Sequence, residues 1–300
     1  MKKAISIIAG LVVLLACHKV HARPAGGDTS LLWQISGKGL PKSSYLFGTI
    51  HLICPTDHVW TTTMQQTLDK SEKVCLELDM SAMGLGADDD LDEATMANMN
   101  MMLDFTKALS EYFTPQQYKQ LEKYVRDSLN MSPSMILMLK PVTMLMLITQ
   151  HTASPCDAPL SYEADIMHRV AGKKEMMGLE TMFEQFKALE TIPADSAVKY
   201  ILESMDDKKA REEQEEYRKM ITAYKSQDIA TLHTMIASSG QMGTSAAALL
   251  DDRNKKWIDR MAGMMHGSSV FFAVGAGHLA GPNGVISLLR KAGYTVTPLR

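Results

Sequence analysis

The chain has 300 residues, 46% hydrophobic and 22% charged, which is the composition of an ordinary globular protein able to form a sizeable core. Its formal net charge of -3 excludes nucleic acid and an anionic membrane surface as the main partner. The 24 methionines are unusually many. We interpret them as adaptable filling for helix cores, and a surface for a soft metal or a hydrophobic peptide is the alternative.

The first 22 residues are typical of an export signal, with a basic start, an apolar run from Ile5 to Leu15 and small residues after it. The run is too short to span a bilayer. Two processing sites compete. The stretch LLAC (14–17) resembles a lipobox, which would make Cys17 the lipidated first residue, whereas VHA (20–22) suits ordinary signal peptidase. Both predict an exported protein of the periplasm or cell envelope, and lipidation would make it an outer-membrane lipoprotein whose only membrane contact is that anchor.

The first elements after this segment read as strand, strand, helix, strand. Apolar runs at 31–36 and 44–52 flank a Gly- and Pro-containing turn, which predicts a hairpin. Residues 59–71 suit a helix with Asp57 as its cap, and 73–80 is a short apolar strand. A strand, a helix and a strand at this spacing predict a βαβ unit with parallel pairing.

The middle of the chain is largely helical in pattern. A polar, acidic break at 84–93 is followed by helices from about 94 to 151, in which Pro141 is expected to bend or interrupt its helix. The following elements are a helix at 161–172, a strand at 173–180, a helix at 181–192 and charged helices over 194–238.

The last segment returns to alternating helices and strands. Its elements are a helix at 249–265, a strand at 269–275, a helix at 283–293 and a strand at 294–299. We predict an α+β fold with an α/β-like core, in which N- and C-terminal segments build a mixed, partly parallel central sheet. Residues 30–300 would form one domain, with helical insertions at about 94–151 and 194–238.

Two strands end in the same short motif. YLFGTIH (45–51) and FFAVGAGH (271–278) both close in Gly-x-x-His, with Gly48 before His51 and Gly275 before His278. Ligands collect at the carboxyl ends of parallel strands, and a glycine there permits close approach of backbone or ligand. Two converging imidazoles suit a divalent metal or an acid/base pair, and two histidines that only satisfy loop backbone are the alternative.

A carboxylate completes the motif chemically. Glu77 lies near the end of the strand CLELD, on the face opposite Leu76 and Leu78. An acid in an apolar strand is costly to bury, so it is either a solvated strand end or a functional group. As a ligand it would complete a two-His, one-carboxylate set, and as a general base it would activate water. Glu180, which closes the strand EMMGLE, is a similar candidate.

Other common signatures are absent from the sequence. GAGHLA (275–280) follows a strand and opens a helix, but no Asp or Glu occurs from Leu279 to Arg300, so a dinucleotide site is excluded. There is no His-Glu-x-x-His, Gly-x-Ser-x-Gly or P-loop. The isolated polar residues on helices and loops are interpreted as surface residues; they are Asp57, His58, His151, His168 and His233.

Export changes the interpretation of the cysteines, because disulfides persist outside the cytoplasm. Besides Cys17 the chain has Cys54, just after the first Gly-x-x-His, Cys156 in the loop SPCDAP, and Cys75 inside a strand. We interpret Cys75 as a buried thiol and Cys54–Cys156 as the preferred disulfide, although the sequence does not fix connectivity.

Together these motifs resemble the TraB/PrgY/GumN family, which is related to the Tiki metalloproteases. The resemblance covers about residues 30 to 300, and its motifs are YLFGTIHL, LELD, GLET, DRNKKW and VGAGHLAGPNGVISLLRKAGYTVTPL. It implies a fold like that of ChaN and the erythromycin esterases, with the two Gly-x-x-His motifs and an acid as the active site of a divalent-metal-dependent peptidase.

The resemblance assigns roles to individual positions. His51 and His278 correspond to the site histidines, Gly48 and Gly275 to the glycines that shape the site, and Glu77 to the acid. The residues matching motif positions with supporting or substrate-binding roles are Asp165, Glu180, Arg253 and Asn254. Arg253 would hold a peptide carboxylate or orient Glu77, since its guanidinium suits bidentate pairing.

The expected function is therefore an exported metal-dependent hydrolase, most simply a peptidase, that uses Mn, Co or Zn and acts on a peptide or small secreted ligand. Two alternatives remain. One is a non-catalytic protein that sequesters a peptide or other ligand in the same site. The other is a lipoprotein that binds haem or a metal.

Overall fold

A six-stranded mixed sheet forms the centre of the computed structural model, which describes residues 29–78, 100–152, 155–156, 158–238 and 245–300. The strands are β1 (Leu32–Ser36), β2 (Ser44–Thr49), β3 (Lys73–Leu78), β4 (Glu175–Glu180), β5 (Val270–Gly275) and β6 (Thr295–Leu299). Their spatial order is β4-β3-β5-β2-β1-β6. The predicted mixed sheet of N- and C-terminal segments is confirmed.

The sheet has a parallel part and an antiparallel part. Strands β2, β5, β3 and β4 pair in parallel, whereas β1 pairs antiparallel with both β2 and β6. The predicted hairpin of β1 and β2 is therefore confirmed. The predicted parallel direction of β2 and β3 is confirmed, because both run parallel to β5, but the two strands do not pair with each other, since β5 lies between them. Strand β5, VFFAVG, is buried along almost its whole length, and a strand covered on both faces belongs at the centre of a sheet.

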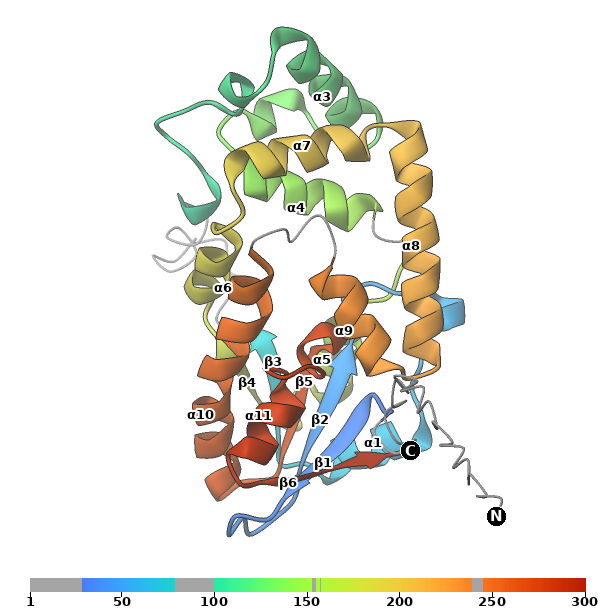
Figure 1. The fold of residues 1–300 in the computed structure, drawn as a ribbon, viewed down its shortest axis with the longest axis vertical. Coiled ribbons are helices and arrows are strands. Elements are labelled where there is room, and N and C mark those ends of the chain that lie inside the picture. The colour runs from blue at the N-terminus through green and yellow to red at the C-terminus, as the bar shows by residue number, and fades with distance from the viewer. Residues whose placement is uncertain (1–28, 79–99, 153–154, 157, 239–244) are drawn as a thin grey trace, which may run out of the picture.

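Helices surround the sheet and extend beyond it (Figure 1). They are α1 (Thr62–Lys70), α3 (Pro115–Asp127), α4 (Pro141–Thr152), α5 (Tyr162–Val170), α6 (Met182–Leu189), α7 (Ala194–Ser204), α8 (Asp207–Lys225), α9 (Ile229–Ala237), α10 (Asp252–Gly267) and α11 (Val285–Lys291). Figure 1 shows β2 and β3 pointing toward the group formed by α3, α4 and α7, with the long α8 running from that group to the sheet. Among the described residues, no helix combines the length and apolar character needed to cross a bilayer.

Among the described residues, most buried apolar side chains fall into two separate clusters. The larger lies around the sheet and includes Trp33, Phe271 and Trp257. The smaller lies among α3, α4 and α7 and includes Leu121 and Ile201. We call these the sheet core and the helical core.

Two local predictions are corrected. Helix α1 begins later than expected, because Thr61 caps it by accepting a hydrogen bond from the Met64 N–H, while Asp57 ends a short 3-10 turn, Pro55–Asp57. Pro141 does not interrupt a helix. It is the first residue of α4, where its missing N–H would have no helical partner.

Candidate functional site

The two Gly-x-x-His motifs lie side by side, because β2 and β5 pair in parallel with Thr49 opposite Gly275. Gly48 is required for this contact. A Cβ atom at Gly48 would lie 3.2 Å from Ala276 Cα, in the second motif, and 2.6 Å from a methyl carbon of Leu279, the residue directly after it. The first glycine therefore allows the second motif to approach β2 closely.

The glycine of the second motif makes room for the acid of β3. The Gly275 N–H donates to Glu77 Oε1 at 2.7 Å, and a Cβ atom at Gly275 would lie 3.2 Å from the same oxygen. Glu77 is buried, so this backbone donor satisfies an oxygen that water does not reach freely. Strand β5 thus contributes a donor to Glu77 as well as a histidine to the site.

Arg253, from α10, joins Glu77 to Glu180 at the end of β4. Its Nη2 lies 2.6 Å from Glu77 Oε2 and 2.6 Å from Glu180 Oε1, and its Nε donates to Glu180 at 3.1 Å. Its Nη1 donates to the Leu249 carbonyl at 3.0 Å and lies 3.2 Å from His278 Nε2. Every N–H of the guanidinium therefore has an acceptor within the protein. This favours orientation of Glu77 over binding of a substrate carboxylate, the two roles that the sequence left open.

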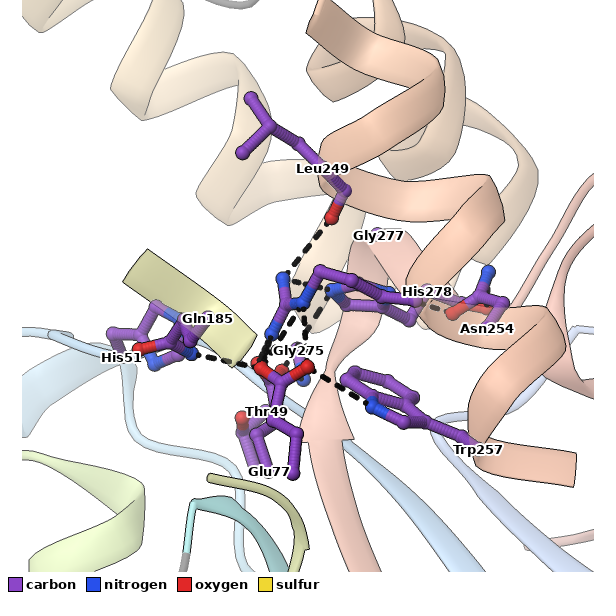
Figure 2. Close-up of polar contacts among 12 residues, drawn as sticks. Thr49, His51, Glu77, Gln185, Leu249, Asn254, Trp257, Gly275, Gly277 and His278 are labelled. Carbon is purple, nitrogen blue, oxygen red and sulfur yellow. Dashed lines mark hydrogen bonds and ion pairs between the residues drawn. The ribbon is translucent and has the colours of Figure 1, made fainter. Parts of the chain in front are cut away.

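His278 is held in one orientation by Asn254, also from α10. The Asn254 amide nitrogen donates to the carbonyls of His278 and Asn283, so its Oδ1 is the acceptor 2.7 Å from His278 Nδ1. His278 Nδ1 therefore carries the proton, and its Nε2 presents a lone pair. The Trp257 ring packs against the imidazole of His278, with the two ring centroids 4.5 Å apart. Figure 2 shows Glu77, Trp257 and His278 pointing toward one another.

The protonation states of this group follow from burial and charge. Burial lowers the pKa of His278 to about 3, with Arg253 acting in the same direction and Glu77 opposing, so the imidazole is neutral at neutral pH. Burial alone would raise the pKa of Glu77, but His278, Arg253, His51 and the Gly275 N–H lower it to about 2. Arg253 is the permanent charge among them, so an ionised carboxylate stands 3.8 Å from a neutral imidazole.

His51 has a carboxylate partner of its own. Its Nδ1 lies 3.2 Å from Glu163 Oε1, at the start of α5, and Glu163 also accepts from Thr49 Oγ1 at 2.9 Å and Ser161 Oγ at 3.1 Å. The hydrogen bond to Glu163 raises the pKa of His51 to about 9, burial opposes it, and the charges of Glu163 and Glu77 add to it. The His51 side chain is 71% exposed, so solvent screens part of this attraction. At neutral pH the ring is protonated, and its Nε2–H points to accessible space.

The structure brings most of the predicted site residues together. A single network contains Glu77, Glu180, Arg253, Asn254, Gly275 and His278. Asp165 lies outside it, since it pairs with Arg169 at 2.9 Å and approaches His58 at 3.6 Å.

Two further side chains belong to the site. Glu163 holds His51, and the Trp257 indole N–H donates to Glu180 at 3.2 Å while its ring faces His278. Both lie in segments that the sequence had marked, since Glu163 follows a Ser cap and Trp257 ends DRNKKW. The signal for Glu163 was its position in the first turn of a helix, where an acid is common for reasons unrelated to function.

A disulfide anchors the segment that follows His51. Cys54 and Cys156, the pair preferred from the sequence, are joined with their Cα atoms 5.9 Å apart, and Ile53 forms an isolated bridge with Leu160. This ties the loop after β2 to the chain that enters α5, the helix of Glu163. Cys75 is a buried thiol, and Cys17 lies outside the described residues.

The donor chemistry fits a divalent metal. In both histidines Nδ1 is engaged by an oxygen acceptor and Nε2 is the nitrogen left for a ligand, which is the usual arrangement of metal-binding imidazoles. His51, with a pKa of about 9, is protonated at neutral pH and would release its Nε2 proton when a metal binds. In the described part of the chain, no three His, Cys, Asp or Glu side chains are yet gathered at metal-binding distances. Arg253 Nη1 and a metal would compete for the lone pair of His278, so binding there requires that contact to open.

Comparison with known proteins identifies one family. A search of curated proteins and a search of solved structures found no match. The family model described as the TraB/PrgY/gumN family matches residues 31–298, which is nearly the whole chain and includes both Gly-x-x-His motifs. The chain therefore belongs to the TraB/PrgY/gumN family.

Proposed function

We propose that this protein is a divalent-metal-dependent hydrolase that cleaves amide bonds in a peptide. The observation that carries the proposal is the pair of histidines from neighbouring parallel strands, each with its Nδ1 fixed, beside a buried ionised carboxylate. His51 and His278 would hold the metal, with Glu77 as a third ligand or as the general base, and with Mn, Co or Zn as candidates.

The side chains have distinct roles in such a reaction. When bound, the ion's contribution would be polarisation of the substrate carbonyl and a lowered pKa for a bound water. Arg253 and the Gly275 N–H orient Glu77 but also help to hold its pKa at about 2, so Glu77 would act as a base only as its contact with Arg253 opens. As the general base it would then accept the proton of the attacking water. That proton then goes to the leaving nitrogen, so that one water molecule is added across the amide bond.

The first test is the metal content of the protein purified without chelators. We expect about one equivalent of a transition metal, lost in the His51→Ala, His278→Ala double variant. The matched control is His168→Ala, His266→Ala, since both of these histidines are exposed and lie elsewhere. A wild type that stays free of metal after incubation with Mn, Co and Zn would rule out the metal-dependent mechanism.

A second function, sequestration of a peptide or other secreted ligand without catalysis, is favoured by one observation. Arg253 already satisfies Glu77, Glu180 and the lone pair of His278, so the polar network is complete without a metal. Peptide binding that survives Glu77→Gln, with no cleavage by the wild type, would support this alternative. A bound metal or haem without any peptide cleavage would instead support the metal- or haem-binding lipoprotein.

We also propose that the site works outside the cytoplasm. The support is the signal-like segment 1–22 in the sequence, with lipidation at Cys17 as one outcome. Cell fractionation of the wild type and Cys17→Ala separates the cases. A wild type that is bound to the membrane, with a Cys17→Ala variant that is not, supports the lipoprotein. If the wild type and the Cys17→Ala variant are both exported and soluble, ordinary signal-peptidase cleavage is supported. A wild type found in the cytoplasm contradicts export.

A further inference from the structure

Two side chains from the hairpin of α8 and α9 hold the backbones of the two Gly-x-x-His motifs. His233 in α9 places Nδ1 3.0 Å from the carbonyl of Gly277, the residue directly before His278. Tyr224 in α8 donates its hydroxyl to the carbonyl of Gly48 at 2.9 Å. The two helices are consecutive in the chain, and each reaches one motif.

The His233 contact has a defined direction. A carbonyl oxygen only accepts hydrogen bonds, so Nδ1 of His233 must carry its proton and donate. The acceptor lies in the 3-10 turn Ala276–His278, whose last residue is the site histidine. The turn is closely packed against α9, because a Cβ atom at Gly277 would lie 2.8 Å from an Ile236 methyl carbon. His233 therefore holds the short turn that presents the imidazole of His278.

The Tyr224 contact is equally specific. The Tyr224 side chain is fully buried, and its ring lies 5.8 Å from that of Tyr162 at the start of α5. The carbonyl it binds belongs to the glycine that packs against the second motif. Without the hydroxyl this carbonyl would lose a buried donor at the point where the two motifs touch.

We propose that His233 and Tyr224 are positioning residues that fix where His278 and His51 stand relative to each other. Sequence alone had assigned His233 to the surface, yet its ring lies against the second motif and is only partly exposed. The proposal rests on the proposed function only in treating His51 and His278 as the working groups. Its test therefore reads the imidazole rings directly, with no need for activity.

The first experiment compares ring ¹H–¹⁵N correlations of His278 in the full-length chain and its variants. His233→Asn keeps an N–H donor at the position of Nδ1, whereas His233→Gln moves the donor to the position of Nε2, and both remain polar and similar in size. We expect wild type and His233→Asn to show one His278 tautomer, protonated at Nδ1. In His233→Gln we expect displaced or doubled His278 signals. His168→Ala, on the exposed face of α5, is the control.

The companion experiment replaces Tyr224 by Phe, which removes only the hydroxyl. We expect the ring signals of His51 to shift in Tyr224→Phe and to stay in place in Tyr45→Phe, at the opposite end of β2. Signals of His278 in His233→Gln and of His51 in Tyr224→Phe that coincide with those of the wild type would overturn the proposal.

A Zn titration separates this inference from the proposed function. We expect Zn affinity at least tenfold weaker in His233→Gln than in wild type and His233→Asn. A wild type that binds none of Zn, Mn and Co in the same titration contradicts the metal-dependent mechanism. The ring signals of His278 and His51 then test the positioning role without the metal. Equal Zn affinity in all three proteins, with unchanged signals, would show that His233 does not position His278.

Discussion

Glu77 concentrates the chemistry of the site in one carboxylate, because it contacts a backbone donor, a guanidinium and a neutral imidazole at once. Its two oxygens are held in fixed directions. An ionised acid in this setting is ready to accept a proton without first being reoriented. In the proposed hydrolase, substitution of Glu77 is therefore expected to affect peptide cleavage most.

Replacement of Glu77 by Gln is expected to lower peptide cleavage by roughly 10²-fold or more, the usual contribution of a general base. The amide oxygen can still accept from the Gly275 N–H, while the amide nitrogen loses the contact with Arg253 Nη2, which keeps Glu180 as its acceptor. The fold and peptide binding are therefore expected to persist. The measurement is cleavage of a peptide library beside calorimetric binding. The control is Glu175→Gln at the exposed start of β4, and a Glu77→Gln protein with wild-type turnover would remove Glu77 from the mechanism.

Glu163 and Asp165 lie two residues apart in α5, yet only Glu163 contacts His51. Because this contact raises the pKa of His51, Glu163→Gln is expected to lower that pKa from about 9 toward 6.5, whereas Asp165→Asn leaves it nearly unchanged. At neutral pH the substitution therefore converts a protonated His51 to a mixture with the neutral form. Titration of the His51 signals by NMR measures this, and equal pKa values in the two variants would contradict the assigned pair.

The residues that sequence could identify are those whose type conflicts with their surroundings. Glu77 and Glu180 are acids in apolar strands, and His51 and His278 follow glycines at strand ends. Glu163 gave no such conflict, since an acid in the first turn of a helix is ordinary. Its role depends on α5 lying beside the end of β2, a tertiary contact that the local sequence pattern does not indicate.

At the scale of elements, the disulfide is the strongest constraint on the loop after β2. It closes a separation of 102 residues, and cross-links over long separations stabilise mainly by restricting the unfolded chain. The Cys54→Ser, Cys156→Ser double variant is expected to lose about 2–4 kcal/mol of unfolding free energy. Denaturant titration measures the loss, and reduction of the wild type should reproduce it. An unchanged midpoint in both would show that the bridge does not stabilise the fold.

The local sequence pattern predicted the types of the elements. It did not predict where α1 and α4 begin, or that β5 lies between β2 and β3. The start of α1 depends on Thr61 accepting from the Met64 N–H rather than on Asp57, and both are good capping residues by type. The position of β5 between β2 and β3 depends on pairing over some two hundred residues, which periodicity within a strand does not encode.

The whole molecule is divided between the sheet core and the helical core, which are separate clusters of buried residues. We expect two calorimetric transitions, because the two clusters have no buried residue in common. Ile201→Ala, in the helical core, should lower the unfolding free energy of one transition by about 2–5 kcal/mol and leave the midpoint of the other unchanged. Leu289→Ala, in the sheet core, is the matched variant and should shift only the second transition. A single transition moved by both substitutions would contradict this division.

The place of β5 between β2 and β3 also has a consequence for synthesis. A ribosome makes the strand of His51 and the strand of Glu77 early, but the strand that joins them is made only after residue 270. Until then β2 and β3 each lack the neighbour that would satisfy one edge, and contacts of such long sequence separation form slowly. The unfinished chain is therefore expected to lack the complete sheet and, with it, the contact of Glu77 with the Gly275 N–H. A chain in that condition is suited to being threaded through a membrane before it folds.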